Sequence, residues 1–177
     1  DNSTLTLAFN EAVYNTNGGS GSLEASDFVL SITGGTATVA GTPTSISASL
    51  GNTYTLGLSL SGTPDGNEVI KVVPATNAVY DANGTAGTTT QSNNTVNLNE
   101  KVVPTITAVS LASDNSTLAV TFSESVFATN SGSGNLAVGD FVFSLTGGIA
   151  TLSSTTPSSI SISGNVYTLG ITYAGLP

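Results

Sequence analysis

The chain has 177 residues, of which 11 are acidic, two are lysines and none is histidine or cysteine, and its formal net charge is −9. These absences exclude Ser-His and Cys-His nucleophile pairs, the usual zinc sites and thiol redox chemistry. With Lys71 and Lys101 as the only cationic side chains, the chain has no basic patch for phosphate, and we expect no nucleic-acid partner.

Short segments in which apolar and polar residues alternate follow one another along the chain, which is the period of a half-buried β-strand. We expect strands, in chain order, at residues 4–9, 28–32, 46–48, 54–60, 69–73 and 105–111. Turns rich in glycine and asparagine separate them at 17–19, 34–35, 51–52, 64–67 and 81–84. No segment has the 3.6-residue period of a helix, and no apolar run is long enough to insert into a membrane. The predicted fold is all-β, built as antiparallel β-sandwich modules.

The sequence contains an internal repeat with an offset of about 113 residues and a one-residue slip near Pro43 and Pro157. The repeated segments are DNSTLTLAFNEAV (1–13) with DNSTLAVTFSESV (114–126), LEASDFVLSITGG (23–35) with LAVGDFVFSLTGG (136–148), and GNTYTLGLSLSGTP (51–64) with GNVYTLGITYAGLP (164–177). We therefore predict two modules, 1–103 and 104–177. The first lacks a counterpart of the strand at 105–111, and the second lacks a counterpart of 65–100. Two sources for the missing strands stay open, which are further chain on either side or a neighbouring chain that adds a strand.

Several short motifs accompany this repeat. Pro104-Thr105-Ile106 opens a strand, TFSESV ends one, an Asp140-Phe141 pair follows about 15 residues later, and residues 81–84 form an Asp-x-x-Gly turn. In these motifs, over nearly its whole length, the chain resembles the bacterial Ig-like tandem repeats of giant cell-surface proteins, including the SWM type. The resemblance implies tandem Ig-like β-sandwiches, the first nearly complete and the second partial, that act as spacer or adhesive modules without catalytic activity. A cysteine-free composition rich in Thr, Ser, Asn and Gly also favours an extracellular or cell-surface location.

The few acidic residues recur at repeated positions, Glu11 with Glu124 and Asp27 with Asp140. Oxygen ligands on loops are what Ca²⁺ requires, and we expect that these side chains could converge at one end of a sandwich. The candidate ligands are Glu11, Asp27, Asp81, Asn83, Glu124 and Asp140, with calcium as the one candidate cofactor. The alternative is that the carboxylates accept backbone N–H groups at strand ends. No EF-hand loop is present to decide between the two.

A pair of carboxylates could also catalyse glycoside hydrolysis. The chain has no tryptophan to line a sugar cleft, and a small repeated module rarely carries a full active site, so we expect no enzyme. The expected function is a rigid spacer or a polymerising fibre subunit whose partners are neighbouring repeats or identical chains. The alternative is a module that binds cell-surface glycans or another surface through the loops Asn15–Ser22 and Asn130–Asn135.

Overall fold

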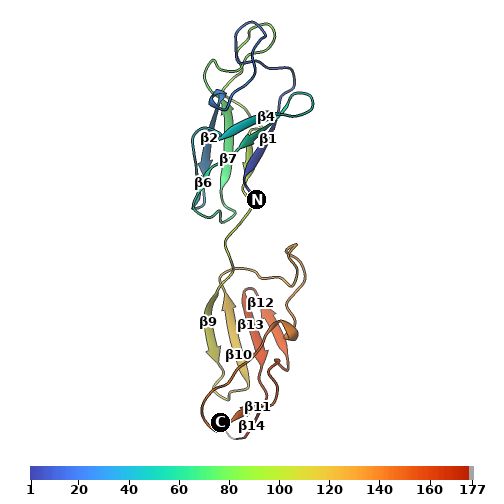
Figure 1. The fold of residues 1–177 in the computed structure, drawn as a ribbon. Helices are drawn as coiled ribbons and strands as arrows, with labels where there is room; N and C mark the ends of the chain where they lie inside the picture. The colour runs from blue at the N-terminus through green and yellow to red at the C-terminus, as the bar shows by residue number, and fades with distance from the viewer. Residues whose placement is uncertain (176–177) are drawn as a thin grey trace. The chain divides into compact units, whose positions relative to one another are not determined.

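The computed structural model describes residues 1–175, and it is all-β apart from two three-residue 3-10 helices (Figure 1). Contacts within the chain divide it into two compact units, Asp1–Val102 (unit one) and a second that begins at Val103 (unit two). The sequence analysis places this boundary one residue later. Among the described residues, no helix has the length and apolar character needed to cross a membrane.

Unit one contains three antiparallel sheets, with strand orders β1-β5-β4, β2-β7-β8 and β3-β6. A 3-10 helix, Ala25–Asp27, leads into β2. The strands are β1 (Thr4–Ala8), β2 (Phe28–Thr33), β3 (Thr38–Val39), β4 (Ser45–Ala48), β5 (Thr53–Gly57), β6 (Leu60–Ser61), β7 (Val69–Pro74) and β8 (Thr95–Asn97).

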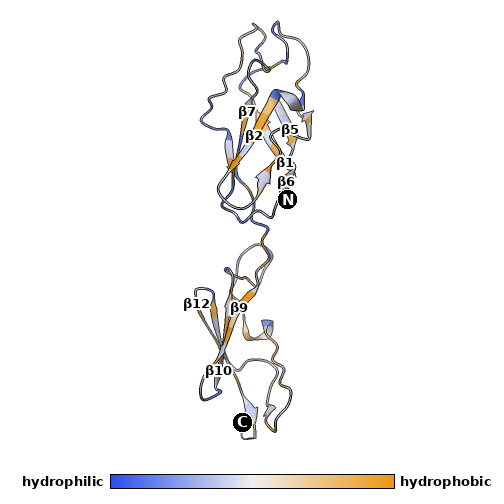
Figure 2. Cartoon of the chain, turned by 90° about the vertical axis from the view of Figure 1, so that its left-hand side faces the viewer, coloured by the Kyte–Doolittle hydropathy of each residue, from blue (hydrophilic) through white to orange (hydrophobic). Residues whose placement is uncertain are grey.

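The two larger sheets of unit one pack on a shared apolar core, which makes the unit a sandwich. Phe28 and Val72 enter this core from the β2-β7-β8 sheet and Leu56 enters it from β5, all three almost fully buried. Leu5 and Leu7 of β1 pack against the same cluster. The alternation in the sequence therefore predicts these strands correctly, because the apolar side of each pleat faces the core. Figure 2 shows how the apolar residues gather along the strands.

The predicted strand at 54–60 is wrong in one respect, because it divides between two sheets. β5 ends at Gly57, and β6 pairs with β3 in a different sheet. Gly57 lies against the 44–45 segment so closely that a Cβ there would be 2.5 Å from the Thr44 and Ser45 hydroxyl oxygens. The chain changes partner directly after Leu58, whose N–H still donates to the Ser3 carbonyl next to β1 at 2.8 Å. The following carbonyl, that of Ser59, accepts the Ala40 N–H next to β3 at 3.0 Å.

Unit two contains a four-stranded antiparallel sheet in the order β12-β13-β10-β9 and a two-stranded ladder of β11 and β14. Its core cluster contains Val120, Tyr167 and Leu169. A 3-10 helix spans Val138–Asp140. The strands are β9 (Ile106–Leu111), β10 (Thr117–Phe122), β11 (Thr151–Leu152), β12 (Ile160–Ser163), β13 (Val166–Gly170) and β14 (Tyr173–Ala174).

The two units repeat five strands with the same pairings. β10, β11, β12, β13 and β14 occupy the positions of β1, β3, β4, β5 and β6, and Leu118 pairs with Leu169 as Leu5 pairs with Leu56. The two units differ at the segment 141–146, the counterpart of β2, which is not a strand. β2 has β7 as its ladder partner, and unit two has no counterpart of β7 among the described residues.

Candidate functional site

Asp27 and Asp140, two of the predicted calcium ligands, each accept a hydrogen bond from a backbone N–H group. Asp27 Oδ2 accepts the Glu24 N–H at 2.7 Å, and Asp140 Oδ2 accepts the Ala137 N–H at 2.8 Å. Each carboxylate thereby closes the 3-10 turn that precedes the segment of β2 or its counterpart. These hydrogen bonds are of the kind expected from local capping, the alternative to a metal site.

Asp81 has a similar local function in the turn at 81–84. Its Oδ1 accepts the N–H groups of Asn83 and Thr85, both at 2.8 Å. These hydrogen bonds, that from Thr85 first, lower the pKa of the Asp81 carboxyl below its usual value. Asn83 contributes its backbone to this turn, and its side chain is exposed.

The predicted convergence of acidic ligands is not found in the part of the chain that the structure describes. Within residues 1–175, no three acidic side chains lie close enough together to hold a metal ion. Glu11 is exposed, and Glu124 has one buried carboxylate oxygen without a hydrogen-bond partner among these residues. The described residues therefore offer no three-carboxylate cluster for the calcium hypothesis, and calcium binding stays a prediction.

Glu68 is the most unusual polar residue of the molecule, because its side chain has no exposed surface. Its Oε1 accepts the N–H groups of Thr36 and Ala37, both at 2.9 Å. Its Oε2 accepts the N–H groups of Asp65 and Gly66, at 3.0 and 3.1 Å. A buried carboxylate needs this degree of compensation, because removal of a charge from water is costly without hydrogen bonds.

The hydrogen bonds also determine the charge state of this carboxylate. Donation by backbone N–H groups, that of Ala37 first, outweighs the effect of burial and lowers the pKa of Glu68 from 4.5 to about 2. Glu68 is therefore ionised at neutral pH and ties the start of β7 to the turn after β2.

Two glycines make room for this arrangement. A Cβ at Gly35 would lie 2.2 Å from the Glu68 carboxyl carbon, and one at Gly34 would lie 2.4 Å from the Asn67 carbonyl oxygen. Both glycines also have positive φ angles, 76° and 58° for Gly34 and Gly35. The Gly-Gly turn thus serves both the backbone conformation and the close approach of Glu68.

Sequence reasoning overlooked Glu68, which stands directly after the predicted turn at 64–67 and looks like a solvated charge. Residues 104–177 contain no counterpart of Glu68 for comparison. The one available signal was the Gly-Gly pair, which recurs at Gly147 and Gly148. Its close approach to another residue is visible only in the fold.

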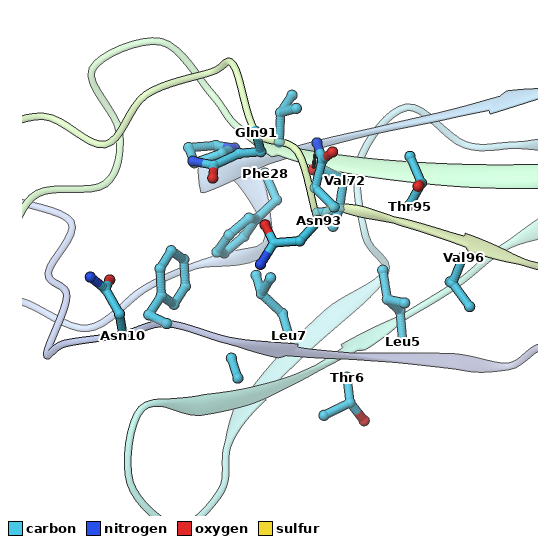
Figure 3. Close-up of a pocket in the computed structure, with 15 residues that line it drawn as sticks. Leu5, Thr6, Leu7, Asn10, Phe28, Val72, Gln91, Asn93, Thr95 and Val96 are labelled. Carbon is cyan, nitrogen blue, oxygen red and sulfur yellow. Dashed lines mark hydrogen bonds between the residues drawn. The ribbon is translucent and has the colours of Figure 1, made fainter.

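A second feature of unit one is a cavity of about 510 Å³ between β1 and the segment that leads into β8. In Figure 3, Leu5 and Leu7 point into it, Thr6 points away, and Asn93 and Val96 approach from the opposite side. β1 pairs with β5 on one side only. In unit two the equivalent strand, β10, has a further neighbour, β9. The cavity therefore borders a strand edge without a partner among the described residues.

At each of the two loops proposed for glycan binding, a threonine hydroxyl group donates a hydrogen bond to a serine carbonyl four residues later. In the first, Thr16 Oγ1 donates to the Ser20 carbonyl. At the second, Thr129, which directly precedes the loop, donates from Oγ1 to the Ser133 carbonyl at 2.8 Å. These equivalent hydrogen bonds indicate that the loops are built alike in both copies.

The chain matches no family model, no curated protein and no solved structure in the comparisons with known proteins.

Proposed function

We propose that the chain is part of a structural repeat array, acting as a spacer or fibre subunit of an extracellular or cell-surface bacterial filament or adhesin with Ig-like modules. The observation that carries this proposal is the repetition of five strands, with the same pairings, on two separate apolar cores. A repeated module that retains its own core can bear load or set a distance without a reaction site.

The use of the acidic side chains supports the same function. Asp27, Asp81 and Glu68 all accept backbone N–H groups that hold turns in place. Asp114 does the same in unit two, where its Oδ1 accepts the Ser116 N–H at 3.0 Å. Their carboxylates stabilise the modules, which is the chemistry expected of a scaffold.

Force spectroscopy of a polyprotein with several copies of the chain tests the proposal. Unit one, Asp1–Val102, should unfold in a single event that releases roughly 350 Å of chain, from about 3.5 Å per extended residue. The variant Leu56→Ala should lower the unfolding force, because Leu56 is fully buried, whereas Leu50→Ala should leave it unchanged, because Leu50 is 96% exposed. Extension without a force peak would contradict a load-bearing function.

A further inference from the structure

One face of unit two exposes apolar side chains along the segment 141–150. Ile149 is 86% exposed and Leu145 is 51% exposed. A hollow of about 400 Å³ lies beside them, lined by Phe143, Leu145, Leu118 of β10 and Tyr173 of β14, among others. Contiguous exposed apolar surface of this kind marks an interaction site.

Unit one shows what covers the same face there. β2 pairs with β7 in antiparallel register, so that Ile32 lies opposite Ile70, which is 1% exposed. β7 in turn pairs with β8. The counterpart of Ile32 in unit two is Leu145, which borders the hollow. The hollow therefore corresponds to the place where a strand of the β7 type adds its apolar side chains.

A pair of backbone N–H groups makes the face electrostatically complementary to a carboxylate. In unit one the N–H groups of Thr36 and Ala37 both donate to Glu68 Oε1. Their counterparts are the N–H groups of Ile149 and Ala150, and neither has an acceptor within residues 1–175. Two adjacent donors of this kind favour an anionic acceptor.

The space for that carboxylate is also present. Gly147 and Gly148 repeat the Gly-Gly turn, with φ angles of 79° and 71°. A Cβ built on either one would meet no described atom within 4 Å, whereas at Gly35 it would meet the Glu68 carboxylate. The turn of unit two thus retains the conformation that accepts the glutamate, with open space above it.

An asparagine at the edge of the face gives a third, independent indication. Asn2 has a φ of 62°, and its Oδ1 accepts the Asn99 N–H at 2.8 Å while its Nδ2 donates to the Asn99 carbonyl at 2.7 Å. Its counterpart Asn115 has a φ of 61° and lines the hollow of unit two. Among the described residues, the Asn115 side chain has no such partner.

We propose that this face of unit two binds an extended polypeptide segment with the chemistry of residues 67–99, in which a glutamate directly precedes a strand of alternating apolar residues and an asparagine follows. The glutamate carboxylate accepts the Ile149 and Ala150 N–H groups above Gly148. The strand pairs with the segment 141–146, and its apolar side chains fill the hollow. This proposal rests on the proposed function as an array of structural repeats and names the partner that completes one of them.

The test uses the full chain and a synthetic, fluorescein-labelled peptide of residues 65–100. Fluorescence anisotropy should show saturable binding, and hydrogen exchange should slow in the segment 141–150. A peptide with Glu68→Gln should bind at least about tenfold more weakly, because an amide has a single acceptor oxygen and its NH₂ group opposes the backbone donors.

Two glycine variants of the full chain localise the site. Gly148→Ala places a methyl group where the carboxylate must lie, and it should abolish binding. Gly164→Ala is the matched control, because Gly164 also has a positive φ, 57°, with no described atom within 4 Å of a Cβ, and it lies in the β12–β13 turn. This variant should bind as the parent chain does.

Three results would overturn the proposal: no binding at about 1 mM chain, equal binding of the Glu68→Gln peptide, or equal loss of binding in both glycine variants. A fourth would assign the face to a second copy of the chain, namely protection of residues 141–150 in the chain alone that disappears on dilution. None of these results alters the unfolding force of unit one, so that failure here is distinguishable from failure of the proposed structural function.

Discussion

The contact between Gly35 and Glu68 can be tested with two glycine variants of unit one. Gly35 has a φ of 58° and Gly51 has a φ of 71°, but a Cβ at Gly51 meets nothing within 4 Å, whereas at Gly35 it lies 2.2 Å from the Glu68 carboxyl. An alanine at positive φ costs about 1 kcal/mol, and this cost is common to both variants. Gly35→Ala must in addition displace a side chain that has no exposed surface.

The size of the extra penalty follows from the backbone donors that lose their acceptor. A buried N–H group without a partner costs about 1–3 kcal/mol, and Thr36 and Ala37 both donate to the oxygen that the new methyl group displaces. We therefore expect Gly35→Ala to destabilise unit one by at least about 2 kcal/mol more than Gly51→Ala. In a domain of this size, that difference lowers the melting temperature by roughly 8–16 °C.

Scanning calorimetry of the full chain measures the two melting temperatures, and hydrogen exchange in β2 and β7 assigns the transition to unit one. The penalty of Gly35→Ala should shrink in a Glu68→Ala background, because the shorter side chain no longer occupies the contested space. If Gly35→Ala and Gly51→Ala are equally stable, the glycine serves the turn alone, and the close approach has no energetic weight.

Three further predictions follow from the same geometry. The pKa of Glu68 is lowered from 4.5 to about 2 in the folded state, so the stability that its charge contributes is complete above about pH 4.5 and is lost as the pH falls toward 2. Glu68→Gln should therefore be less stable than the parent chain at pH 7. Urea unfolding should show that this difference in stability disappears between pH 4.5 and 2. Leu56→Ala should lower the free energy of unfolding of unit one by about 3 kcal/mol. The equivalent Leu169→Ala should lower that of unit two by less, because the open face lets neighbouring side chains fill the space. Equal decreases in chemical denaturation would argue against an open face. Melting in calcium and in chelator separates the two uses of the carboxylates. Equal temperatures are expected if Asp27 and Asp81 serve only the backbone donors that they accept, and a large upward shift in calcium would support the calcium prediction.

The strands could be predicted where one face of the sheet is buried and the other is exposed to solvent. Leu5 and Leu7 alternate with exposed threonines, and β1 lies where that pattern places it. The pattern fails at Gly57, because apolar residues continue on the same side after the chain has moved from one sheet to another. Alternation of apolar and polar residues indicates which side chains are buried, but it does not indicate which sheet the strand belongs to.

The repeat predicted some of the polar chemistry and missed the rest. Asp27 and Asp140 were recognisable because they recur, and each closes the equivalent 3-10 turn of its own unit. Glu68 was not recognisable, because two of its four donors come from Thr36 and Ala37, more than 30 residues earlier in the chain. The residues next to Glu68 in the sequence do not indicate that its side chain contacts such a distant segment.

The open face of unit two has a consequence for the order in which such a module assembles during synthesis. The ladders of β10 with β13 and of β11 with β14 are in place without a β7 counterpart. The early strands of a module can therefore pair before the later residues of the chain are synthesised. In unit one, Glu68 follows β1 to β6 along the chain, so its hydrogen bonds with Thr36 and Ala37 form only after those strands have been synthesised.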